Sequence, residues 1–296
     1  MNLLHSASPG ASVVTPGGRC NTSMPGRALP CTAMDRRATV TAPRTLWALT
    51  GFAIALLAGF TAAAAIDTRT FQDANVWLKP AKFALSFVVL FATLALVVER
   101  LSEAVREGRT LRITLGAMTL AFWAEMAYIG IQAARGQASH FNVGSPTAAL
   151  LYSLMGAGAV TLVVGIGMIG MLAWRDRNAD LGPALRLGVL LGFALSMVAT
   201  LITAGVLSSQ GGHFVGTPSD TAAVIPGLGW SGEVGDLRPA HFLALHAMQV
   251  LPLLGLWLDR RGHGGTLTLT IATVVYIALT AAVFIQALMG MPLVRL

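Results

Sequence analysis

Residues 148–174 read AALLYSLMGAGAVTLVVGIGMIGMLAW, an apolar run without a single charged side chain. About 20 such residues, each rising roughly 1.5 Å, carry a helix across the hydrocarbon core of a bilayer. Only helices and closed barrels satisfy the backbone in that core, and this run lacks the alternation of a barrel strand. The stretch therefore predicts a transmembrane helix.

The same pattern recurs six times along the chain. The further apolar runs are 46–66, 83–98 (extended outward to Pro80), 113–134, 187–207, 240–258 and 267–291, and Glu125 is the one charge deep within any of them. Only 11% of the residues are charged, against roughly 25% in soluble domains, so charge is confined to the segments between the runs. We expect an all-α, seven-helix membrane domain over residues 44–296, with one long loop at 208–239.

Basic residues are distributed unevenly between the two sides of this domain. If the chain starts inside, twelve Lys and Arg lie in inner segments, without counting Arg19 and Arg27 of the tail, and six lie in outer ones. Such residues are retained on the cytoplasmic side, so the N-terminus is predicted inside and the C-terminus outside. The basic residues form no stripe with interleaved aromatic residues, which argues against nucleic-acid binding.

Residues 1–43 are rich in Ser, Pro, Gly and Thr and show no apolar period, so we expect a disordered tail. Met34 offers an alternative start, in which case 1–33 are not translated. Both cysteines, Cys20 and Cys31, fall in this tail.

The glycines of 148–174 include the spacing G-x-G-x-x-G at Gly165, Gly167 and Gly170. A dinucleotide site needs this motif in a strand-to-helix turn, and here it lies within an apolar span. Together with Gly156 and Gly158, the motif instead predicts a smooth face for close helix–helix packing.

Histidines gather on the predicted outer side, where neutral imidazole could bind Zn, Cu or haem iron. His140, His241 and His246 are the metal candidates, and Gln249 is a further ligand candidate. At about 100° per residue, Gln249 lies about 80° and His246 about 140° from His241, on one broad helix face. Pro252 is expected to kink this helix and to free the carbonyl of Met248.

Glu125 is the second kind of candidate, because an ionisable residue within a span marks a functional site by default. It lies roughly 13 Å below the outer end of its helix, and His246 lies roughly 9 Å below that of its own, so we expect one shared site. Tyr128 and Gln132 follow on the face of Glu125 and support it.

Cations next to the outer end form the third group. Lys79 and Lys82 flank the start of a helix, where partial positive charge makes lysine unfavourable unless an anion is bound. With Arg238 they are the anion-binding candidates; Asn142 and Asp236 are supporting residues.

Three segments, 77–86 (WLKPAKFALS), 139–142 (SHFN) and 241–249 (HFLALHAMQ), resemble a family of uncharacterised bacterial multi-pass membrane proteins with no known activity. The resemblance covers nearly all of residues 45–290 and implies a location in the bacterial inner membrane. It implies no mechanism.

Three functions remain open from the sequence. The first is a metal- or haem-binding, redox-active site in the outer half. The second is a proton- or ion-coupled transporter that uses Glu125, and the third is a non-catalytic receptor, sensor or assembly factor. All three place the chain in a lipid bilayer with a small molecule or ion bound on the outer side; catalysis and oligomeric state are left undecided.

Overall fold

The computed structural model describes residues 41–71, 74–219, 221–262 and 265–296. The predicted tail therefore lies outside the described residues, apart from its last three positions. Seven helices in the described ranges are long and apolar enough to cross a membrane: α1 (Ala42–Ile66), α2 (Leu78–Val98), α4 (Arg109–Ala134), α5 (Pro146–Arg175), α6 (Pro183–Ser209), α7 (Arg238–Arg260) and α8 (Thr266–Leu288). The seven-helix, all-α prediction is confirmed.

Helix α2 carries two of the residues predicted to bind an anion. It begins at Leu78 rather than near Pro80, so Lys79 and Lys82 both lie in its first two turns. Pro80 fits there because the first helical N–H groups have no partner within the helix, and its fixed φ suits the first turn.

The remaining elements are short and lie outside the spans. Helix α3 (Glu103–Arg106) follows α2. Strands β1 (Thr70–Phe71) and β2 (Ala74–Asn75) form one antiparallel pair, and β3 (Phe214–Val215) and β4 (Gly235–Asp236) form another.

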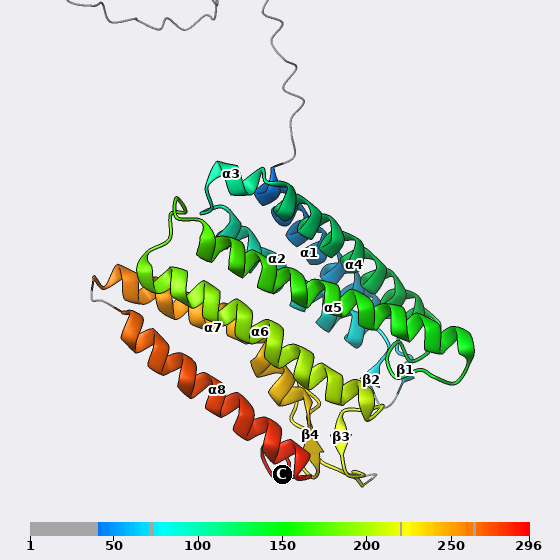
Figure 1. Cartoon of the computed structure of the whole chain (residues 1–296). Helices are drawn as coiled ribbons and strands as arrows, with labels where there is room; N and C mark the ends of the chain where they lie inside the picture. Colours follow the sequence, from blue (N-terminus) through cyan, green and yellow to red (C-terminus); the bar gives the residue numbers. More distant parts are fainter. Residues whose placement is uncertain (1–40, 72–73, 220, 263–264) are drawn as a thin grey trace, which may run out of the picture. The chain divides into compact units, whose positions relative to one another are not determined.

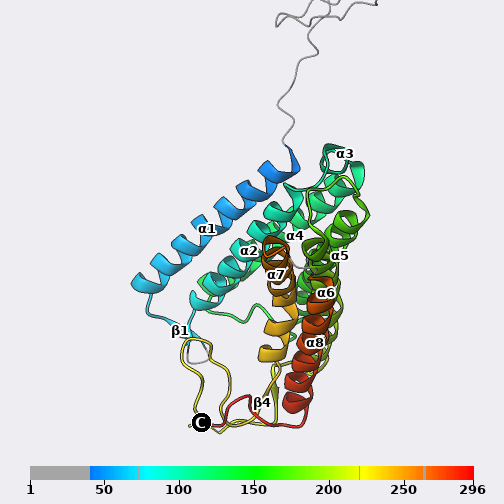
Figure 2. The same ribbon diagram turned by 90° about the vertical axis from the view of Figure 1, so that its left-hand side faces the viewer.

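The spans form two groups (Figure 1). Helices α1, α2, α4 and α5 pack together, as do α6, α7 and α8, and contact between α5 and α6 joins the groups. Helix α1 packs along α2 at one edge of the bundle (Figure 2). Its buried residues all lie between Ala42 and Ala53, so the second half of α1 has few contacts with the bundle.

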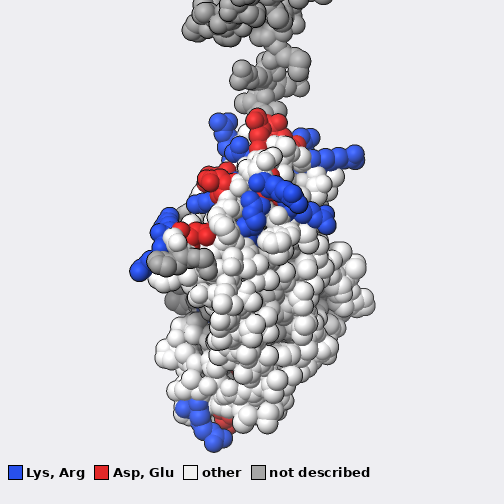
Figure 3. Space-filling view, turned by 60° about the vertical axis from the view of Figure 1, so that its left-hand side comes forward, with Lys and Arg blue, Asp and Glu red and all other residues white. Residues whose placement is uncertain are grey.

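An aromatic core fills the first group. The ring of Phe122 lies 4.9 Å from that of Phe87 and 5.1 Å from that of Phe91, both edge to face. The outward faces are apolar as well, and Figure 3 shows a broad band free of charged side chains between two charged ends. Lipid is the solvent that suits such a band, so the chain is a multi-pass membrane protein.

The two ends of the bundle differ in structure. We call the end formed by residues 67–77, 135–145, 210–237 and 289–296 the outer end, after the orientation that the charge asymmetry predicts. The opposite end, where α1 begins, is the inner end. Both β pairs belong to the outer end.

Glycines allow the helices to approach closely, as predicted for α5. A methyl group added at Gly165 would lie 2.5 Å from the Met118 sulfur of α4, and one at Gly170 would lie 2.7 Å from Phe193 of α6. Gly156 does not share this role, because no atom lies within 4 Å of its added methyl. The glycine motif thus serves helix packing at most of its positions.

Contact between α6 and α7 depends on glycines that the sequence analysis did not single out. Methyl groups at Gly188 and Gly192 would lie 2.6 Å from the Leu251 carbonyl oxygen and 2.7 Å from the Ala247 carbonyl oxygen. These two glycines flank Pro252, whose ring also lies near Gly192. Pro252 of α7 therefore packs against a small-residue surface of α6.

Asp259, near the inner end of α7, caps the start of α6. Its two carboxylate oxygens accept hydrogen bonds from the backbone N–H groups of Ala184 (3.0 Å) and Leu185 (2.8 Å). A carboxylate is well suited to the free N–H groups and partial positive charge of a helix N-terminus.

Candidate functional site

Two of the predicted anion-binding residues meet on one turn of the outer loop. Lys82 donates to the carbonyl oxygen of Leu228 (3.4 Å), and Arg238 donates to that of Gly229 (2.6 Å). Lys82 comes from α2 and Arg238 from the first residue of α7. Because adjacent carbonyls hold the two cations, segments far apart in the sequence place like charges close together.

Lys79 completes this group, which we call the outer cationic cluster (Lys79, Lys82 and Arg238). Burial, and then the nearby charge of Lys79, lower the pKa of His140 to about 3. Burial and Arg238, with a smaller effect of Lys79, lower the pKa of His213 to about 4, although Asp236 opposes the shift. Both histidines are therefore neutral near pH 7 and lie close to the cluster.

Asp236, predicted as a supporting residue, organises the roof of the cluster. It is buried, forms a salt bridge with Arg238 (2.6 Å) and accepts a hydrogen bond from the backbone N–H of Ser231 (3.0 Å). The negative charge of Asp236 therefore balances the positive charge of Arg238 and does not balance the charges of the two lysines.

His140 holds the loop between α4 and α5 against α2. Its Nδ1 lies 3.1 Å from the Ser139 hydroxyl oxygen, and its ring contacts Phe83 of α2 and Tyr152 of α5. The conformation around it is unusual, since Phe141 has a φ of +57°. Non-glycine residues rarely adopt this region, so the loop is held by its contacts in a specific shape.

The two histidines of α7 face different neighbours. His241 Nδ1 lies 2.9 Å from the Thr203 hydroxyl of α6. His246 Nδ1 lies 3.2 Å from the Gln249 side-chain oxygen, and the Gln249 amide donates to the Thr93 hydroxyl of α2 (3.2 Å). Thr93 and Thr203 are partners that the sequence analysis missed, because a threonine within a span carries no signal of its partner.

The structure does not bring the three histidines predicted as metal candidates together. Among the described residues no group of three or more His, Cys, Asp or Glu side chains could hold a metal ion. The two histidines of α7 are about 140° apart on the helix and have different partners, since His241 lies against Thr203 of α6 and His246 against Gln249 of its own helix. His140 belongs to a separate neighbourhood on the loop.

Glu125 lies within the bundle, against α5. The residue is 4% exposed, and its Oε1 has no hydrogen-bond partner in the described part of the chain. A methyl group added at Gly158 would lie 3.0 Å from that oxygen. No salt bridge joins Glu125 to His246 among the described residues, and the shared site of these two residues stays a prediction.

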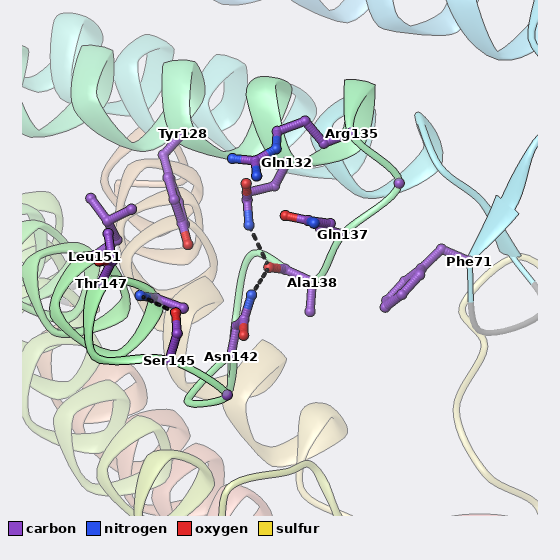
Figure 4. A pocket seen from close by; sticks show the side chains of 13 residues that line it. Phe71, Tyr128, Gln132, Arg135, Gln137, Ala138, Asn142, Ser145, Thr147 and Leu151 are labelled. Atoms are coloured by element: carbon purple, nitrogen blue, oxygen red, sulfur yellow. Dashed lines mark hydrogen bonds between the residues drawn. The ribbon is translucent and has the colours of Figure 1, made fainter.

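A cavity of about 550 Å³ opens at the outer end of α4. Its lining combines apolar and polar side chains and one cation: Phe71, Tyr128, Gln132, Arg135, Gly136, Gln137, Ala138, Asn142, Gly144, Ser145, Thr147, Ala148 and Leu151. Figure 4 shows the Tyr128 ring entering from α4, with Phe71 on the opposite side. The predicted supporting residues Tyr128, Gln132 and Asn142 all belong to this lining.

Hydrogen bonds shape the wall of the cavity. The side-chain amides of Gln132 (2.9 Å) and Asn142 (3.1 Å) both donate to the Ala138 carbonyl oxygen (Figure 4). On the other side, Arg69 bonds to the Ala134 carbonyl (3.0 Å) and holds the β1–β2 hairpin that carries Phe71. The cavity is thus built by a fixed loop on one side and a fastened hairpin on the other.

The outer cationic cluster, Glu125 and the cavity are the candidate sites among the described residues. The resemblance to uncharacterised bacterial membrane proteins stays a prediction. Comparison of the chain with protein-family models, with curated proteins and with solved structures gave no match.

Proposed function

We propose that this membrane protein binds a small anionic ligand, a carboxylate or a phosphate, at its outer end. The observation that supports this proposal is the convergence of Lys79, Lys82 and Arg238 from two helices under one loop. Asp236 pairs with Arg238 and not with the lysines, so Lys79 and Lys82 gain no counter-charge from it, and like charges that are held together repel and lower stability. A bound anion supplies that counter-charge.

The surroundings of the cluster favour an anion over a metal ion. The free N–H groups at the start of α2 add partial positive charge beside Lys79. His140 and His213 are neutral near pH 7, so each can donate one hydrogen bond to a carboxylate or phosphate oxygen. The metal- or haem-binding interpretation loses its main support, because its three histidines have separate partners.

Binding to protein reconstituted in lipid nanodiscs tests the proposal. Inorganic phosphate, acetate and succinate are the probes, and calorimetry measures their affinities. Lys79→Gln and Lys82→Gln should each weaken the best-binding anion by about ten-fold, since a hydrogen bond to a charged group contributes roughly 1.5–3 kcal/mol. Affinity should also fall as salt is raised from about 0.01 M to 1 M, because exposed charges are screened.

Arg295→Gln serves as the matched control. Arg295 is an exposed cation of the same outer end, outside the cluster, so its removal should leave affinity unchanged. The proposal fails if none of the three probes binds, or if Lys79→Gln and Lys82→Gln bind as tightly as the wild type. Uptake of the bound anion into proteoliposomes then separates a carrier from a receptor.

A further inference from the structure

Helices α4 and α5 pack in a regular antiparallel register. Glu125 of α4 lies opposite Gly158 of α5. Seven residues closer to the inner end on each helix, Met118 lies opposite Gly165. In both pairs the missing side chain on α5 makes room for a large side chain of α4. The carboxyl group of Glu125 is therefore enclosed between two helices rather than directed at lipid.

The cavity continues this contact line toward the outer end. Tyr128 and Gln132 follow Glu125 at i+3 and i+7 on the same face of α4, and both line the cavity with Leu151 of α5. The Tyr128 hydroxyl is buried and, like Glu125 Oε1, has no hydrogen-bond partner among the described residues. One residue with an unpaired polar group, Tyr128, thus lines the cavity, and a second, Glu125, lies about one helical turn further toward the inner end.

Unpaired polar groups within a bilayer carry a large desolvation cost, so their retention indicates a ligand. A metal cation does not suit this place, because Ca²⁺ or Mg²⁺ takes about six or more oxygen ligands and the seam offers one carboxyl and one hydroxyl. A proton needs only the carboxylate.

Charged and titratable groups on the helices around α4 lie away from Glu125. They are Arg44 of α1, Lys79 and Lys82 of α2, Glu103 and Arg106 of α3, and Tyr152 and Arg175 of α5. All but Tyr152 lie in the first or last two turns of their helix or in α3, and the Tyr152 hydroxyl bonds to Ser208 of α6. Tyr128 on α4 itself is the one titratable neighbour on the face of Glu125.

We propose that Glu125 is a proton-binding site that opens to the outer end through the cavity, with the Tyr128 hydroxyl between them. A proton from cavity water adds to the carboxylate, which becomes a neutral carboxylic acid, and the reverse step returns the proton to water. The inference goes beyond the proposed anion binding and does not depend on it, since the two sites share no residue.

Cysteine accessibility tests the route. In a chain with Cys20→Ser and Cys31→Ser, single cysteines replace Glu125 or Tyr128, and a membrane-impermeant methanethiosulfonate is added on the side that carries Val143. Ala124→Cys and Ala127→Cys are the matched controls, because both lie on the exposed face of α4. Glu125→Cys and Tyr128→Cys should react about ten-fold faster than the controls, since a thiol reacts as the thiolate, which forms in water.

Carbodiimide labelling tests proton binding in the protein with its native carboxyl group. An apolar carbodiimide reacts with the protonated acid, so mass spectrometry should find the adduct on Glu125, in an amount that falls as pH rises. Gly158→Ala, which places a methyl 3.0 Å from Oε1, should reduce the adduct several-fold, whereas Gly156→Ala, with open space, should not.

Two results would overturn the inference. One is equal reactivity of Glu125→Cys and the lipid-facing controls. The other is an adduct on Glu125 that is absent or independent of pH. Neither result bears on anion binding, which depends on Lys79 and Lys82.

Discussion

A few buried polar residues interrupt the apolar core of this bundle. The buried side-chain oxygens without a partner, among the described residues, are Glu125 Oε1, the Tyr128 hydroxyl and the Thr200 hydroxyl. Other buried polar side chains of the described spans have partners; for example, Ser196 donates to the Leu245 carbonyl, and Tyr276 donates to that of Leu243. Hydrogen bonding is therefore the rule in this bundle, which makes the unpaired carboxyl group at Glu125 a feature that needs a function.

His213 makes the outer end sensitive to acid. Burial lowers its pKa from 6.5 to about 4 in the folded protein, so the unfolded chain takes up a proton first as pH falls. Protonation of His213 therefore does not reduce the free energy of unfolding above about pH 6.5, but reduces it progressively as pH falls from 6.5 toward 4. His213→Gln should therefore reduce the drop in Tm between pH 7 and pH 5 by a few degrees, about 3 °C.

Thermal unfolding in detergent at the two pH values measures this difference. Val143→Ala, a substitution of an exposed residue on another outer loop, should leave the wild-type drop intact. An identical drop in wild type and His213→Gln would contradict the assignment.

The residue types of the candidate site could be identified from the sequence, but their partners could not. Glu125 and the lysines stand out because charge is rare in spans, and Tyr128 and Gln132 follow from helical spacing. The pairing of His241 with Thr203, and of Gln249 with Thr93, depends on which helices become neighbours. One sequence carries no signal for that choice, so it could not show that the histidines predicted as metal candidates have separate partners.

At the scale of helices, close packing depends on glycine more than on large side chains. The spans themselves follow from apolar run length, so all seven could be predicted, and the α5 glycines were expected to face neighbours. The close contact between α6 and α7 was not expected, because Gly188 and Gly192 look like ordinary members of an apolar run. Only the structure places them against the backbone of α7 around Pro252.

Gly192→Ala should destabilise the bundle. The added methyl lies 2.7 Å from the Ala247 carbonyl oxygen, so α6 and α7 must move apart, at a cost of about 1–3 kcal/mol. Gly205→Ala is the matched control on the same helix, because no atom lies within 4 Å of its methyl and alanine favours a helix. Thermal unfolding of both variants measures the effect; equal stability would show that this contact does not limit the packing.

For the whole molecule, the odd number of spans determines how the two ends of the chain are placed. The structure places the first and last described helix ends, at Ala42 and Leu288, at opposite ends of the bundle (Figure 1). Seven spans require this, whichever way the bundle is inserted. Only the distribution of Lys and Arg selects one of the two orientations.

Cysteine labelling in intact cells decides the orientation. With Cys20 and Cys31 replaced by serine, an impermeant thiol reagent should label Val143→Cys and Thr217→Cys from outside. Arg106→Cys and Arg177→Cys should react only after the membrane is permeabilised. External labelling at either arginine position would reverse the orientation and place both proposed sites on the cytoplasmic side.

The cap that Asp259 provides has a consequence for biosynthesis. Asp259 follows Ala184 by 75 residues in the chain, so the first N–H groups of α6 lack this acceptor until α7 has been synthesised. Only then do Ala184 and Leu185 find their partner. We therefore expect α6 and α7 to mature as one hairpin, in which completion of the second helix fastens the beginning of the first.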